Sequence, residues 1–175
     1  MTPARSFALD LARGKRAETD PVVFALLRDL YPDGEIRPAP EELDRAGIDL
    51  VIHRAPFPVG VQVKAYGGTL APIRTACVFL EDFSDIGRAV PGWLWTTRAE
   101  VLVARYADAP VAFHIPALRA IAERRGDEWA PHRRLNRSRH RGAVWTSAYW
   151  AVPLREVLGA ILDPTGEIIA ALSSQ

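Results

Sequence analysis

The sequence predicts an α/β fold built on a central mixed β-sheet with helices on its flanks. Segments with helical spacing of apolar residues and short strand-like segments follow one another as helix, several strands, helix, strand, helix. The chain has 175 residues, of which 49% are hydrophobic and 25% are charged, as in an ordinary globular domain with a full core. It has no internal repeat and no long low-complexity linker, so we treat residues 1–175 as a single domain.

The first predicted element is a helix over residues 14–31. Val23, Leu27 and Leu30 recur there at helical spacing. The dipeptide Asp20-Pro21 is typical of an N-cap followed by a first-turn proline, so the regular part of the helix is expected to begin there. The turn sequence YPDG then ends it.

The predicted strands are apolar or alternating segments separated by turn residues. They cover residues 35–38, 48–53, 59–65, 75–81, 100–106, 111–115 and 143–152. We expect the segment 82–98 to be irregular, with Glu81 and Asp82 as the charged end of a strand, and the basic segment 130–142 to be a loop. Further helices are predicted at 117–125, after Pro116, and from Pro153 to about Leu162.

Three polar side chains interrupt strands that are otherwise typical of a buried sheet. Asp49 lies in GIDLVIH, and Gln62 and Lys64 lie in VGVQVKA. A charged residue is rarely placed in a buried strand unless it is paired or has a function. Lys64 is also unusual because Lys15 is the only other lysine among the 22 basic residues.

An antiparallel hairpin of 48–53 and 59–65 brings these polar side chains together. A four-residue loop at 55–58 would pair Val51 with Gln62 and Asp49 with Lys64. Opposed residues share a face of a sheet, so this register places all three polar side chains on one face. The other face then carries Leu50, Ile52, Val61 and Val63. A slip of one residue would bury the wrong set.

The polar group has the chemistry needed to hold a hard divalent cation. Phosphodiester hydrolysis uses such a cation on oxygen ligands, open to water and to a phosphate oxygen. Asp49 would supply a carboxylate, Gln62 Oε1 a neutral oxygen, and the carbonyl of Val63 another. Lys64 would orient or deprotonate the attacking water, or stabilise charge on phosphorus. Glu18 can reach the cluster and add a second carboxylate.

With these residues the chain resembles the PD-(D/E)xK nuclease superfamily. The likeness rests on Glu18 in the first helix, Asp49 in GIDLVI, and Gln62-Val63-Lys64 in VQVKA, and it extends over about residues 14–125. The resemblance implies a restriction-endonuclease-like fold and Mg²⁺- or Mn²⁺-dependent cleavage of DNA. Holliday-junction resolvases and phage or restriction-associated nucleases are the members nearest in size, and a homodimer is implied because many members cut two strands.

The chain departs from the superfamily pattern at two positions. Gln62 stands where an acid is usual, and Ile48 stands where a proline usually precedes the aspartate. The amide removes one negative charge, which should weaken metal binding. The alternative is therefore a catalytically inactive nuclease fold that binds nucleic acid or docks a protein. Cleavage that depends on a divalent ion would distinguish the enzyme from the binding module.

A strongly basic segment, HRRLNRSRHR at 132–141, carries five arginines and two histidines without an acid, although the whole chain has a net charge of only +1. This is more positive charge than solvation of a loop requires, so we expect contacts with DNA phosphates. The arginines are Arg133, Arg134, Arg137, Arg139 and Arg141. An acidic protein is the alternative partner.

Other classes of function have little support in the sequence. Cys77 is the only cysteine and lies in an apolar strand without a nearby histidine, so neither a disulfide nor cysteine catalysis is expected. The chain has neither the HExxH motif of a zinc site nor the GxSxG motif of a serine hydrolase. The apolar runs are too short to cross a bilayer, and the first residues lack the features of a signal peptide. We therefore expect a cytoplasmic protein with no membrane partner.

Overall fold

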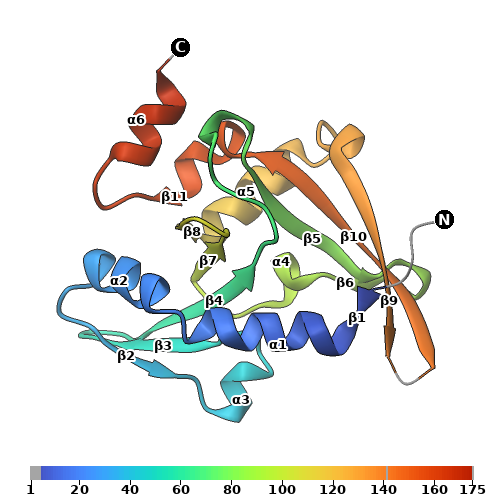
Figure 1. Cartoon of the computed structure of the whole chain (residues 1–175), viewed down its shortest axis with the longest axis horizontal. Coiled ribbons are helices and arrows are strands. Elements are labelled where there is room, and N and C mark those ends of the chain that lie inside the picture. Colours follow the sequence, from blue (N-terminus) through green and yellow to red (C-terminus); the bar gives the residue numbers. More distant parts are fainter. Residues whose placement is uncertain (1–4, 141, 175) are drawn as a thin grey trace.

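The computed structural model describes residues 5–140 and 142–174, which form two β-sheets with helices around them (Figure 1). The larger sheet has six strands in the order β11-β8-β7-β4-β3-β2, and the other has five in the order β1-β9-β10-β5-β6. The α/β class with a mixed, helix-flanked sheet is confirmed. The expectation that all strands join one sheet is wrong, because β5 pairs with β10 and not with β4.

The six-stranded sheet contains most of the predicted strands. Its members are β2 (Glu35–Pro38), β3 (Leu50–His53), β4 (Val59–Ala65), β7 (Val101–Arg105), β8 (Pro110–His114) and β11 (Ile161–Leu162). Only the β4–β7 pair is parallel, and the other pairs are antiparallel. The central strands β4 and β7 are buried on both faces, which explains their almost continuous apolar sequences.

The five-stranded sheet contains the strands whose bounds and partners were predicted less accurately from the sequence. They are β1 (Arg5–Ser6), β5 (Cys77–Asp85), β6 (Val90–Pro91), β9 (Arg133–His140) and β10 (Ala143–Pro153). The prediction of a loop at 130–142 is wrong for β9, which pairs with β10 along one edge and with β1 along the other. Main-chain pairing on both edges, and not intrinsic propensity, makes this arginine-rich segment a strand.

The helices lie outside the sheets. They are α1 (Phe7–Glu18), α2 (Pro21–Leu30), α3 (Glu41–Asp44), α4 (Trp93–Thr96), α5 (Ile115–Arg125) and α6 (Glu167–Ser173). The single helix predicted at 14–31 is two helices, because Asp20 caps α2 by accepting a hydrogen bond from the N–H of Val22 at 3.1 Å. Short 3₁₀ segments occur at Ile73–Thr75, Ile86–Arg88, Ala130–His132 and Leu154–Ala160, and the last replaces the predicted helix after Pro153.

A hydrophobic cluster covers each face of the six-stranded sheet. On one face, Val23 and Leu27 of α2 are fully buried against Leu50 and Ile52 of β3. Burying one such side chain contributes about 1.5–3 kcal/mol to stability. The other cluster fills the space towards the second sheet and α5, and includes Leu80, Phe113 and Trp129. Within the described ranges, no helix is both long and apolar enough to span a bilayer.

Candidate functional site

The β3–β4 hairpin positions the predicted site, in a register two residues away from the expected one. Leu50 pairs with Val61 and Ile52 with Val59. The connection between the paired residues is therefore 53–58 and not 55–58. A shift by an even number of residues keeps each side chain of a strand on its predicted face. Leu50, Ile52, Val61 and Val63 accordingly lie in one apolar cluster.

Asp49 lies immediately before β3, and both its main-chain N–H and its carbonyl are hydrogen-bonded. Its N–H donates to the carbonyl of Val61 at 2.8 Å, and its own carbonyl accepts from the N–H of Ala39 at 3.0 Å. Its carboxylate Oδ2 accepts from the N–H of Val63 at 2.6 Å. The side chain thus takes the place of a main-chain acceptor on the edge of β4. A residue's N–H and C=O point to the same edge of a strand, so the Val63 carbonyl faces this carboxylate's side as well.

The environment of Asp49 disfavours its charge. Burial raises the pKa of its carboxyl above the ordinary value of 3.8, and the carboxylates of Glu18 and Asp44 raise it further. The hydrogen bond from Val63 and the charge of Lys64 act in the opposite direction. A carboxylate that is buried among other acids gains stability from a cation, so Asp49 has the electrostatics of a cation ligand.

Gln62 is the second predicted ligand, and its amide oxygen is buried without a partner. The side chain is 4% exposed, and Oε1 accepts no hydrogen bond. Leaving such an atom unpaired costs about 1–3 kcal/mol. Its Nε2 packs against Gly47, where a Cβ would lie 3.2 Å from Nε2 and 2.8 Å from Thr97 Oγ1. Gly47 also has a φ of 79°, so only glycine suits this position.

Lys64 lies at the far end of β4, between Asp49 and an acid from the other sheet. Its Nζ is 5.9 Å from the centre of the Trp93 ring. The charge of Lys64 also acts on Glu81 of β5, whose pKa is raised mainly by burial. Oε2 of Glu81 accepts from the N–H of Trp93 at 3.1 Å. The prediction of a strand end at Glu81 is wrong, because β5 continues to Asp85.

Glu18 comes close to the cluster but already has a partner. It is the last residue of α1, and its Oε2 is 3.0 Å from the Nζ of Lys15. The same Nζ lies 3.3 Å from Asp44 Oδ1. The ammonium group of Lys15 is therefore shared by Glu18 and Asp44 and offsets one of their two negative charges. From the sequence, Asp44 in LDRAGID is expected to be a loop cap and not a ligand, and nothing points to Lys15. No local pattern links these two residues, because they are far apart along the chain.

The donors at this site fit Mg²⁺ through one carboxylate and neutral oxygens. In the described part of the chain, no three His, Cys, Asp or Glu side chains are grouped so as to hold a metal ion. Mg²⁺ commonly uses only one or two carboxylates and keeps several waters. The unpaired Oε1 of Gln62 is the observation that supports the fit, because a buried carbonyl oxygen without a donor can serve as a neutral ligand. Asp49 and the Val63 carbonyl would complete the protein's share.

The predicted nucleic-acid contacts lie on β9, away from this cluster. Arg133 is engaged, since it bonds to Asp82 and its guanidinium lies 5.6 Å from the centre of the Phe83 ring. Arg134, Arg137 and Arg139 are exposed. Arg141 lies outside the described residues.

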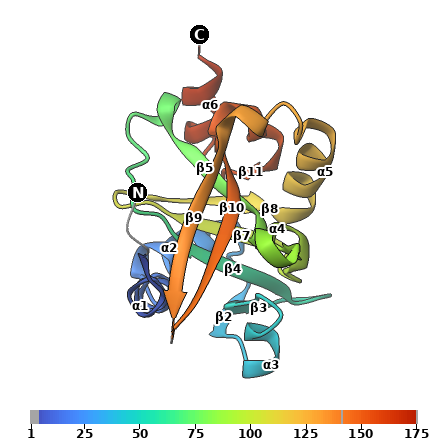
Figure 2. The same ribbon diagram turned by 90° about the vertical axis from the view of Figure 1, so that its right-hand side faces the viewer.

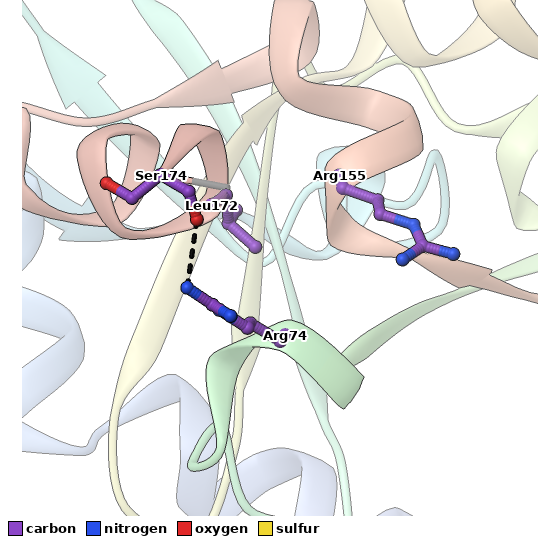
Figure 3. Close-up of a pocket in the computed structure, with 4 residues that line it drawn as sticks. All are labelled: Arg74, Arg155, Leu172 and Ser174. Carbon is purple, nitrogen blue, oxygen red and sulfur yellow. Dashed lines mark hydrogen bonds between the residues drawn. The ribbon is translucent and has the colours of Figure 1, made fainter.

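Two surface pockets lie elsewhere. One, of about 340 Å³, is bordered by Asp82, Trp95 and Arg133. The other, of about 210 Å³, is bordered by Arg74, Arg155, Leu172 and Ser174. Figure 3 shows that Arg74 points towards Ser174, whose carbonyl accepts from its Nη2 at 2.9 Å, while Arg155 points away. The two guanidinium groups do not converge on one ligand, so this pocket is not an anion site.

Comparison with known proteins gave no match, since no family model, no curated protein and no solved structure is significantly similar to this chain.

Proposed function

We propose that this protein is a Mg²⁺-dependent DNA nuclease of the PD-(D/E)xK type, with β3, β4 and α1 as the catalytic part of a restriction-endonuclease-like fold. The observation that carries the proposal is the buried, unpaired Oε1 of Gln62, on the strand that also bears Lys64 and whose Val63 N–H donates to the carboxylate of Asp49. A buried carbonyl oxygen without a donor is a free acceptor that a bound cation would satisfy, and the desolvated carboxylate of Asp49 also gains from a cation.

The proposed roles follow from the positions of the donors. Asp49, Gln62 and the Val63 carbonyl would hold the ion, which when bound polarises a phosphate oxygen and water. Lys64 would orient the attacking water and stabilise the negative charge that develops on the phosphate. Glu18 would contribute as a ligand only after its ion pair with Lys15 opens. Mn²⁺ would fill the same oxygen site.

The test is nicking of supercoiled plasmid with Mg²⁺, Mn²⁺ or EDTA. The parent protein should nick only with a divalent ion. Lys64→Ala should lower the rate by about 100-fold or more, as expected for loss of one charge that stabilises the transition state. Asp29→Asn removes one carboxylate from the exposed surface of α2 and is the control for Asp49→Asn. If Lys64→Ala and Asp49→Asn nick as fast as the parent, the proposed catalytic roles are wrong.

One observation favours the alternative of a nucleic-acid-binding module without hydrolysis. Lys15 already pairs with Glu18 and Asp44, so an ammonium group does part of what a metal ion would do. In that case the protein would bind DNA in a salt-sensitive way and cleave none of it with either ion. The cytoplasmic location and the homodimer remain predictions from the sequence.

A further inference from the structure

The strands β9 and β10 form a long ribbon whose outer part extends beyond β5, with the two-residue strand β1 along the outer edge of β9, and one of its faces is open. Figure 2 faces this ribbon, which runs past α1 towards the end of the molecule that carries α3. The pairing sets Arg137 opposite Thr146 and Arg139 opposite Val144. Opposed side chains share a face, so both arginines and their partners lie on the same side. Leu135, on that side too, is 65% exposed, and Val144 is 41% exposed.

The other face of the ribbon is buried in its middle and exposed at Arg134 and Ala143. Ser138 and Ser147 lie on it, and each is 7% exposed. The face that carries Arg137 and Arg139 is the one on which two exposed arginines lie next to each other along the strand. Its base is fixed to the body of the protein by Arg133, which bonds to Asp82. The pairing of β10 with β5 also joins this base to the protein. Because Arg133 is bonded to Asp82, we assign Arg137 and Arg139 as the cations of the open face.

The open face carries positive charge without compensation from its own strands. Residues 132–153, which span the ribbon, contain five arginines and no Asp or Glu. Among the described residues, no ion pair involves Arg137 or Arg139. They are two residues apart on one strand, so their Cα atoms are roughly 6.6–6.8 Å apart. This separation is comparable to that of neighbouring phosphates on one DNA strand.

We propose that the open face of the β9–β10 ribbon binds duplex DNA, with Arg137 and Arg139 on the phosphates of one strand. A two-stranded ribbon fits the major groove of B-DNA, whereas the major groove of duplex RNA is too deep and narrow for side chains to read. Single strands are bound by stacking of bases on aromatic side chains. The exposed part of this face has none, because Trp150 is buried at its base and Trp145 and Tyr149 lie on the opposite face.

This inference deepens the proposed function by naming duplex DNA as the substrate class, and it rests on that function only for the cleavage that follows binding. Its test is made in EDTA, where no cleavage occurs. The experiment therefore tests binding by the ribbon independently of the proposed catalysis. If the protein binds duplex DNA through Arg137 and Arg139 but never nicks it, the nuclease proposal is refuted and the proposal for the ribbon stands.

The experiment measures the affinity of the full chain for a labelled duplex DNA by fluorescence anisotropy across a series of salt concentrations. Each phosphate contact contributes about 0.9 to the slope of log affinity against log salt. Arg137→Ala/Arg139→Ala should therefore lower the slope by about 1.8 and the affinity by roughly 60-fold at about 0.1 M salt. Single-stranded DNA and duplex RNA of the same sequence should bind more weakly and change less.

The control is Arg124→Ala/Arg155→Ala, which removes the same charge from exposed positions outside the ribbon. It should leave the slope unchanged. The proposal is overturned if the parent does not bind duplex DNA, if the control loses as much affinity as the ribbon variant, or if single strands lose as much as the duplex. Binding to an acidic protein that competitor DNA does not displace would assign the face to that protein instead. Thermal unfolding and circular dichroism establish that both variants are folded.

Discussion

Replacement of Asp49 separates the structural role of its side chain from the role of its charge. Asp49→Asn keeps an oxygen that can accept the hydrogen bond from the N–H of Val63, but it removes the charge. Asp49→Ala removes both. Because burial and the neighbouring acids disfavour the carboxylate, the Asn variant should be more stable than the parent at pH 7 in the absence of metal.

The size of the difference between the two variants follows from one hydrogen bond. Val63 is 4% exposed, so in the Ala variant its N–H is left without an acceptor. That loss costs about 1–3 kcal/mol. A chain of this length changes its melting temperature by about 2–4 °C per kcal/mol, so the Ala variant should melt roughly 2–12 °C below the Asn variant.

The pH dependence of the parent gives a second check. The pKa of Asp49 is raised in the folded protein above its ordinary value of 3.8. Below pH 3.8 the carboxyl is protonated in both the folded and unfolded states, and its stabilising contribution is complete. As the pH rises through the raised pKa, the folded state must carry an unfavourable charge and this contribution is lost. Asp49→Asn should therefore be no more stable than the parent at low pH. Its advantage in stability should grow as the pH rises above 3.8.

Thermal and urea unfolding over a range of pH, with and without Mg²⁺, measures all three effects. Mg²⁺ at about tenfold its dissociation constant should stabilise the parent by about 1.4 kcal/mol and the Asn variant much less. The reasoning is refuted if Asp49→Asn is destabilised as much as Asp49→Ala at pH 7, or if Mg²⁺ stabilises all three proteins equally.

Further predictions concern Gln62 and two glycines, Gly92 and Gly14. Gln62→Glu restores the usual acid and should raise Mg²⁺ affinity about tenfold by calorimetric titration, and an unchanged affinity would remove Gln62 from the metal site. Gly92→Ala should lower the free energy of unfolding by about 3 kcal/mol, because a Cβ would lie 2.2 Å from the carbonyl oxygen of Glu81. Gly14→Ala, in α1 with no atom within 4 Å of its Cβ, should instead stabilise the protein by about 1 kcal/mol in urea unfolding. If both glycine variants are equally stable, the close approach at Gly92 is not rigid.

Much of the hairpin could be predicted because its pattern is local. The alternation in GIDLVIH and VGVQVKA identified both strands, and it assigned Leu50 and Val61 to the apolar cluster that they occupy. The exact pairing was missed by two residues, because the length of a connecting loop is not recorded in the alternation of the strands. The error did no harm to the assignment of faces, because the side chains of a strand repeat every two residues.

The strand β9 could not be predicted because its stability comes from its neighbours. The segment RRLNRSRH has no β-branched or aromatic residue. It is a strand because β10 and β1 provide hydrogen-bond partners on both of its edges. That pairing also decides which arginines lie at the base of the ribbon, as Arg133 does, and which lie on its open face, as Arg137 and Arg139 do.

The sequence by itself determined which residues are candidates for the proposed chemistry, namely Asp49, Gln62 and Lys64 in two apolar strands, because burial and alternation are recorded within a few neighbouring positions. Only the tertiary structure decided what surrounds them. It placed Glu81 beside Lys64 and Lys15 between Glu18 and Asp44. These pairs come from elements that meet only when the sheets and helices pack, and no short-range pattern in the chain encodes such meetings.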